Sequence, residues 1–194
     1  MTSFHLTGDA NADELLATDD NALLAGMCLD QQIPMEKAFA GPSVIAERMR
    51  GQFDVLAIAA MPQEEFVDLC AAKPAVHRFP GSMGARLHQL CQVLAEEYQG
   101  DASRLWADGD GAEILRRLKK LPGFGDQKAR IFLALLGKRR GLDAAGWREA
   151  AGEYGQDGYR SVADITDAES LQKVRETKKA AKAAARQAEE GASR

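Results

Sequence analysis

The amino-acid sequence predicts an all-α protein, on three observations. The first is a stretch in which apolar residues recur with the i, i+3, i+4, i+7 spacing of a helix face, at Ile114, Leu115, Leu118 and Leu121. The second is a longer stripe of the same period, formed by Leu87, Leu90, Cys91, Leu94 and Tyr98. The third is the set of breakers that separate such stretches, at Pro34, Pro74, Pro80 and Pro122.

The elements follow in chain order. Residues 3–7 alternate weakly and could form a short extended piece, after which comes an acidic stretch over 9–20. Asn21 is the predicted N-cap of an apolar helix over 22–29, and Ser82 is the predicted N-cap of a long helix that reaches residue 99. Between them we expect helices at 35–39, 43–50, 53–61 and 63–71.

The second half of the chain contains a predicted helical hairpin. Its helices cover 114–121 and the residues from 126 onward, and a short helix around Trp147 and Tyr154 follows. Residues 155–164 have the composition of a loop, and Asp167 could cap a last helix from residue 168.

We therefore expect three regions: an acidic N-terminal segment over 1–20, a helical domain over 21–170, and a basic, alanine-rich helix or tail over 171–194. Within the last region, residues 173–186 carry six basic residues and one acidic residue. Such a tail could be a solvated extension, because alanine and lysine are good helix formers, or it could attract phosphate.

Composition limits the function classes. The 194 residues include 45% hydrophobic ones, enough for a core, and carry a net charge of −4. This balance excludes a histone-like coat of positive charge, so any contact with nucleic acid must come from a local patch.

Cysteine and histidine spacing argues against a metal cofactor. The three cysteines lie far apart without a CxxC pair, which excludes a disulfide framework, a four-thiolate metal site and an iron–sulfur cluster. The three histidines have no spacing typical of a metal site. We expect no cofactor, and cysteines that are small buried hydrophobes.

The sequence also predicts where the protein acts. It has no run of 18 apolar residues, and its first 20 residues are acidic, which argues against a membrane span and a signal peptide. We therefore expect a cytoplasmic monomer that does not contact a membrane.

The most informative motif is LPGFG, Leu121 to Gly125, between the two helices of the hairpin. Gly123 and Gly125 lack a Cβ and can adopt positive φ, so a phosphate can approach the amides of the turn. The first N–H groups of the next helix are unpaired and complete an anion site. Residues 113–140 carry nine basic and two acidic side chains. Double-stranded DNA is therefore the expected partner, and the turn carbonyls could also coordinate a monovalent cation.

An alternative interpretation of LPGFG is an ordinary αα-hairpin with a C-capping glycine and a solvated basic face.

Three segments resemble the helix-hairpin-helix (HhH-GPD) DNA glycosylase superfamily of base-excision repair. They are LLAGMCLDQQIP over 23–34, FPGSMGARLHQLCQVL over 79–94 and LPGFGDQKARIFLALLG over 121–137, in the order of the family. The resemblance implies a two-lobed helical enzyme with a cleft between the lobes. Such an enzyme binds duplex DNA, bends it and turns one nucleotide out of the stack.

The resemblance also implies the residues that contact DNA. In the hairpin they are Leu121, Gly123, Phe124, Gly125, Gln127 and Lys128. Gln31 and Gln32 correspond to side chains that fill the void left by the extruded base, and Phe79 corresponds to a wedge. The alternatives are two polar surface residues at a helix end and a buried turn phenylalanine.

The catalytic positions of the family match less closely. Members that form a Schiff base carry lysine where this chain has Gln127, and the neighbouring Lys128 should point about 100° away from the cleft, toward phosphate. We therefore expect simple hydrolysis of the N-glycosidic bond, which needs a carboxylate to stabilise the sugar cation and activate water.

Two residues are candidates for that carboxylate. The family position reads Ala145, and a loop shorter by two residues would bring Asp143 into register. Asp30, at the end of the 22–29 helix, is the second candidate, because burial in the cleft would raise its pKa. Asp143 could instead be a loop or capping residue, and Asp30 a surface residue.

Three functions remain in competition. The first is a monofunctional glycosylase for a damaged base, such as an alkylated one whose positive ring leaves easily. The second is a catalytically silent DNA-binding module that recognises distorted DNA. The third, a helical protein-interaction domain, leaves the basic hairpin unexplained.

Overall fold

The computed structural model describes residues 4–192, and it confirms the all-α class because this range contains no strand. Residues 1–3 of the predicted N-terminal region and residues 193–194 of the predicted C-terminal region lie outside the described residues. Ser3, the first residue of the predicted extended piece, is among them. The α-helices of the first half are α1 (Ala10–Thr18), α2 (Asp20–Leu29), α3 (Met35–Arg48), α4 (Val55–Ala60), α5 (Gln63–Ala71) and α6 (Pro80–Tyr98). Those of the second half are α7 (Gly111–Lys119), α8 (Asp126–Arg139), α9 (Trp147–Ala151) and α10 (Ala168–Ala192). Three short 3₁₀ helices join them: η1 (Ala102–Leu105), η2 (Gly152–Gly155) and η3 (Val162–Asp164).

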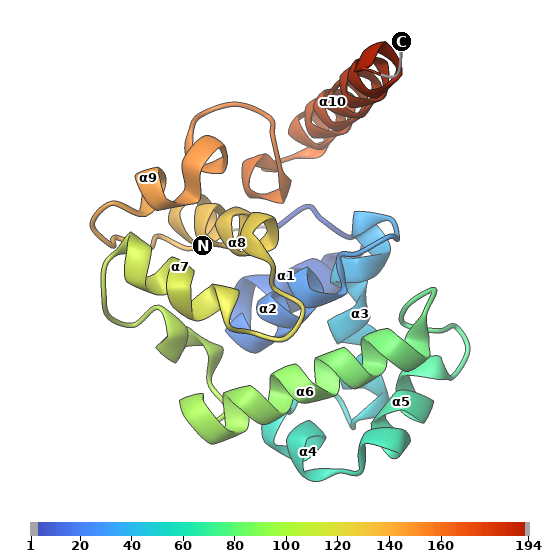
Figure 1. Cartoon of the computed structure of the whole chain (residues 1–194). Helices are drawn as coiled ribbons and strands as arrows, with labels where there is room; N and C mark the ends of the chain where they lie inside the picture. The colour runs from blue at the N-terminus through green and yellow to red at the C-terminus, as the bar shows by residue number, and fades with distance from the viewer. Residues whose placement is uncertain (1–3, 193–194) are drawn as a thin grey trace.

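Helix α2 occupies the centre of the molecule, and its residues from Ala22 to Leu29 are all buried. It packs along α3 and contacts α6 on one side and α8 on the other (Figure 1). A helix that is apolar on every face can lie only inside the core. The ends of α2 are therefore where the neighbouring helices meet.

Two glycines set the distance between α2 and α3. A Cβ on Gly26 would lie 2.7 Å from the Phe39 ring, and one on Gly41 would lie 2.6 Å from the Leu29 side chain. No other residue type fits at these positions without displacing a buried neighbour.

The remaining helices form two groups around α2. Helix α6 packs against α4 and α5, whereas α8 packs against α7, α9, η2 and η3. Helix α10 starts against η3 and then extends away from the other helices (Figure 1). None of the helices within residues 4–192 is long and apolar enough to span a lipid bilayer.

The N-terminal segment departs from the sequence prediction. Residues 4–7 form no strand, and the acidic stretch contains helix α1, whose N-cap Asp9 accepts a hydrogen bond from the Ala12 amide. Leu6 and Leu16 are fully buried in the same core as α2. With only two large apolar residues in nine, α1 carried a weak periodic signal.

Several helix ends also differ from the prediction. Asp19, not Asn21, caps α2, while the Asn21 side chain bridges the Gly100 carbonyl and the Ala102 amide. Residues 35–48 form one helix, with Pro42 inside it, instead of two. Helix α6 begins at Pro80 without a side-chain cap, so Ser82 lies inside its first turn. Asp167 does accept a hydrogen bond from the Ser170 amide at the start of α10, as predicted.

The segment over 155–164, predicted as a loop, is held by one buried ion pair. Lys138 of α8 lies 2.5 Å from Asp164, and the two side chains are only 12% and 4% exposed. Asp164 also accepts hydrogen bonds from the Arg160 and Ser161 amides. This pair fixes the segment that leads from η2 to α10.

Replacing Asp164 with asparagine should lower the free energy of unfolding by about 3 kcal/mol, because the Lys138 charge stays buried without its partner. Urea denaturation followed by circular dichroism measures this change. The control is Asp157→Asn, since Asp157 is fully exposed. Equal stability of the two variants would contradict the assigned role of the pair.

Candidate functional site

The LPGFG turn joins α7 to α8, and its two glycines do different things. Gly123 has φ +82°, as predicted, and a Cβ there would lie 2.6 Å from the Arg86 side chain. Gly125 has φ −76°, so it does not use the freedom of glycine to adopt a positive φ. It is the N-cap of α8, and no atom lies within 4 Å of the place of its missing Cβ. The open side of the turn is therefore at Gly125.

Backbone N–H groups at this turn are left without a hydrogen-bond acceptor among the described residues. No side chain caps α8, and within the described residues the Gly123 and Gly125 amides have no hydrogen-bond partner. By contrast, Phe124 donates its amide to the Leu121 carbonyl at 3.1 Å. The first turn of a helix and such neighbouring amides suit an anion.

Two of the predicted DNA contacts have buried side chains. Leu121 and Phe124 are each 4% exposed, and the Phe124 ring packs edge-on against Phe132. Only their backbone is available for a contact with DNA. The two residues instead hold the turn against the core.

Asp126, the first residue of α8, places a negative charge next to these amides. Hydrogen bonds from Arg130 and Lys119, at 2.7 and 2.8 Å, lower the pKa of its carboxyl to about 2. The carboxylate is therefore ionised at neutral pH, and its two cations balance its charge.

The three segments that carry the family resemblance meet in the structure. The Arg86 guanidinium of α6 donates to the Gln31 Oε1 at 2.8 Å, and the aliphatic part of the same side chain packs beside Gly123 of the turn. His77 Nε2 pairs with the Gln31 carbonyl at 2.9 Å. The thiol of Cys28, in α2, lies 3.9 Å from the Pro122 carbonyl.

The side chains predicted to contact the opened base pair lie on this same surface. Gln31 and Gln32 are exposed, and Gln32 has φ +58°, a conformation that costs energy for a residue with a side chain. Phe79 is 45% exposed, with the Arg78 guanidinium 5.4 Å from its ring centre. The alternative of a buried turn phenylalanine is thereby wrong.

A groove of about 500 Å³ opens beside the turn, between the end of α2 and the start of α8. We call it the α2–α8 groove. Its lining residues are Met27, Asp30, Gln127, Lys128, Ile131, Glu153, Tyr154, Arg160, Thr177, Lys178 and Ala181. A volume of this size is typical of small-molecule sites.

Asp30 and Lys128 are the two half-buried charged residues of the groove, whereas Glu153, Arg160 and Lys178 in its lining are exposed. Burial raises the pKa of Asp30, against the opposing effect of Lys178 and Lys128, and no hydrogen bond to its carboxylate is found within residues 4–192. Burial likewise lowers the pKa of Lys128, whose ammonium donates to the Cys28 carbonyl at 3.1 Å. A carboxylate such as Asp30, with a raised pKa and no hydrogen-bond donor, is typical of functional sites.

The predicted direction of Lys128 is wrong. The helix rotation of about 100° per residue was expected to turn it away from the groove, yet Lys128 lines the groove and contacts the end of α2. The reason is that α8 lies against α2, so this face of its first turn is covered. Gln127, at the family's lysine position, is exposed at the rim and donates to the Tyr154 hydroxyl at 2.9 Å.

Asp143 does not reach the groove. It is exposed, and it follows the far end of α8, a helix about 20 Å long. The neighbouring Ala145 carbonyl accepts the Gly111 amide, which ties this loop to the end of α7 that is remote from the turn. A loop shorter by two residues was expected to bring Asp143 to the family's catalytic position, but in the structure Asp143 lies away from the groove.

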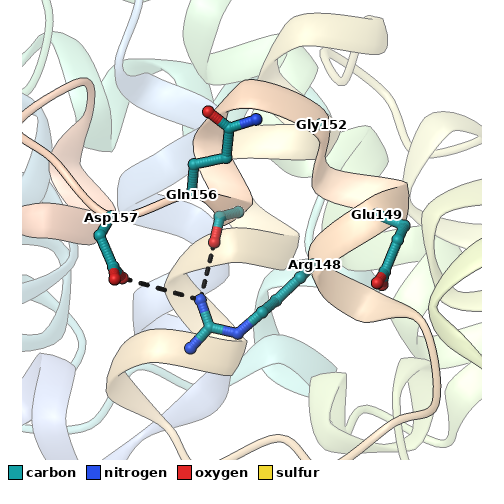
Figure 2. A pocket seen from close by; sticks show the side chains of 6 residues that line it. Arg148, Glu149, Gly152, Gln156 and Asp157 are labelled. Atoms are coloured by element: carbon teal, nitrogen blue, oxygen red, sulfur yellow. Dashed lines mark hydrogen bonds and ion pairs between the residues drawn. The ribbon is translucent and has the colours of Figure 1, made fainter.

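A second depression, of about 600 Å³, lies around Arg148 and Gly152 (Figure 2). The Arg148 side chain points away from Glu149 and donates to the Gly155 carbonyl at 2.8 Å. It also stacks on Trp147. The Arg148 guanidinium is therefore engaged in contacts that hold the local fold, and the α2–α8 groove is the stronger candidate for a functional site.

The described residues contain no group of three or more side chains that could hold a metal ion, and all three cysteines are buried and free. Comparisons with protein-family models, with curated proteins and with solved structures found no match to this chain.

Sequence analysis missed several residues of the site. His77 and Arg86 position Gln31; Glu153 comes from the predicted short helix around Trp147 and Tyr154, Arg160 from the predicted loop and Lys178 from the predicted basic helix or tail. No local pattern marks them, because only the packing of α6, η2 and α10 brings them together.

Gly125→Val should lower affinity for duplex DNA about tenfold or more without changing the melting temperature, because the new side chain enters open space beside the free amides. Fluorescence anisotropy of a labelled duplex and thermal unfolding measure the two effects. Ala60→Val, which enlarges an exposed side chain of α4, is the control. Unchanged affinity for Gly125→Val would contradict the anion site.

Asp30→Asn should raise the melting temperature at pH 7, since the raised pKa of Asp30 means that its charged form is unfavourable in the folded state. The gain should be absent below the ordinary pKa of 3.8 and should grow as the pH rises above it. Melting curves across this range test the sign. Asp143→Asn is the matched control, and a destabilised Asp30→Asn variant would show that Asp30 serves the fold.

Proposed function

We propose that this protein is a two-lobed, monofunctional DNA glycosylase of the helix-hairpin-helix kind. In this proposal the group α4–α6 and the group α7–α10 are the lobes, with α2 between them. The supporting observation is the place of Asp30, a half-buried carboxylate in a groove whose other wall is the hairpin's second helix.

Duplex DNA would bind first at the turn. A phosphate at the Gly125 side accepts hydrogen bonds from the free amides of the turn, and the exposed Lys120 at the end of α7 attracts the strand. Gln31, Gln32 and Phe79 then face the base stack. Their exposure and their closeness to the turn support a role in filling the void that an extruded nucleotide leaves.

The extruded nucleotide would enter the α2–α8 groove with its sugar next to Asp30. As the N-glycosidic bond breaks, its electron pair leaves with the base and positive charge develops on the sugar. The Asp30 carboxylate stabilises this charge and accepts a proton from the water that adds to the anomeric carbon. The charges of Lys128 and Lys178 favour the ionised form of Asp30. An alkylated base suits this site because its ring already carries a positive charge.

Base release is the direct test. The full chain is incubated with duplexes that contain 3-methyladenine, hypoxanthine, uracil or 8-oxoguanine, and alkali then cleaves at abasic sites. Asp30→Asn should reduce release about 100-fold or more, whereas Asp143→Asn should leave it unchanged. The rate should rise with pH through the raised pKa of Asp30, because the ionised form is the active one.

Two outcomes would contradict the proposal. Tight binding without release of any base would favour a catalytically silent module that recognises distorted DNA. An equal loss in the Asp30 and Asp143 variants would remove Asp30 from the reaction.

Borohydride trapping separates hydrolysis from Schiff-base chemistry, which matters because Lys128 lies in the groove. A monofunctional enzyme gives no covalent protein–DNA product on reduction. A product that disappears in Lys128→Gln would replace hydrolysis with a lysine nucleophile.

A further inference from the structure

The exposed part of α10 carries its positive charge on one face. The five basic residues between positions 175 and 186 are all exposed: Arg175, Lys178, Lys179, Lys182 and Arg186. At 3.6 residues per turn they lie within an arc of about 100°. The protein as a whole has a net charge of −4, so this face differs in sign from the average of the molecule.

Within residues 175–186 the single acidic residue points away from this face, whereas Glu189, one turn beyond Arg186, lies on it. Glu176 lies about 100° from Arg175 around the helix, and it accepts a hydrogen bond from Gln172, one turn earlier, at 3.0 Å. No ion pair within residues 4–192 involves Lys179, Lys182 or Arg186. Cations at i, i+4 and i+7 repel one another, and a polyanion would relieve that repulsion.

The opposite face argues against a membrane or a large protein partner. It presents small side chains, namely Ala180, Ala181, Ala184 and Ala188. A helix that inserts into a lipid interface carries Trp, Phe or Leu on that face. Alanine offers little apolar surface to bury, so the charged face is the one available for binding.

Helix α10 is anchored beside the candidate groove. Val174 is buried in the core and Arg175 forms an ion pair with Glu36 at the start of α3. One turn later, Thr177 and Lys178 line the α2–α8 groove. Beyond this point the helix extends away from the other helices (Figure 1).

We propose that the basic face of α10 binds the sugar–phosphate backbone of the duplex that enters the groove. The inference rests on the proposed DNA binding and extends it to a second contact surface. Residues 175 to 186 span about 16 Å of helix, a length along which one DNA strand places about five phosphates. Lys178, at the edge of the groove, joins this surface to the catalytic one.

The salt dependence of binding tests the proposal. The test variant combines Lys179→Gln, Lys182→Gln and Arg186→Gln. The control removes the same charge elsewhere, with Arg50→Gln, Lys73→Gln and Arg104→Gln, at exposed positions just after α3, in the α5–α6 loop and in η1. Binding of a labelled duplex is measured by anisotropy for the full chain and both variants over a series of salt concentrations.

The test variant should reduce the slope of log K against log salt by about two to three, because each lost phosphate contact removes about 0.9. The control should change it by less than about one. Equal slopes for both variants, with binding by the wild type, would overturn the role of α10 alone. Failure of the wild type to bind any duplex would overturn the proposed function as well. Salt-dependent binding to anionic vesicles in place of DNA would identify a membrane surface as the partner and overturn the inference.

Discussion

The complete burial of α2 is the constraint on which the rest of the structure depends. Since every residue from Ala22 to Leu29 is inside, helices must cover this segment on all sides, and α3, α6 and α8 do so. The chain can become polar only where the helix leaves the core. Asp30, Gln31 and Gln32 follow its last buried residue directly, so the core itself delivers them to the junction of three helices.

The electrostatics of this junction separate two kinds of carboxylate. Asp126 lies in solvent between two cations that balance it, and its pKa is lowered accordingly. Asp30 is half-buried and its carboxylate has no hydrogen-bond donor among the described residues, while the nearby Lys128 donates to a backbone carbonyl. The first arrangement favours stability, whereas the second leaves a charge free for chemistry.

Helical periodicity predicted most of the fold, because the apolar residues of α2, α6, α7 and α8 recur in the sequence and are the ones that these helices bury in the core. It failed at α1, where two leucines give little period, and at Pro42, which α3 accommodates. At the site, the segments 23–34, 79–94 and 121–137 contact one another. The direction of Lys128 and the remoteness of Asp143 depend on how α8 lies against α2 and on where its far end goes, and neither is encoded in local spacing.

The glycine contacts between α2 and α3 have a mechanical consequence. With Gly26 pressed against Phe39 and Gly41 against Leu29, neither helix can slide along the other by even part of a turn without a steric clash. The short connection that holds Gln31 and Gln32 is thus clamped at both ends and resists bending. A force applied to this connection is transmitted to the core, so the segment between α2 and α3 is rigid and does not act as a hinge.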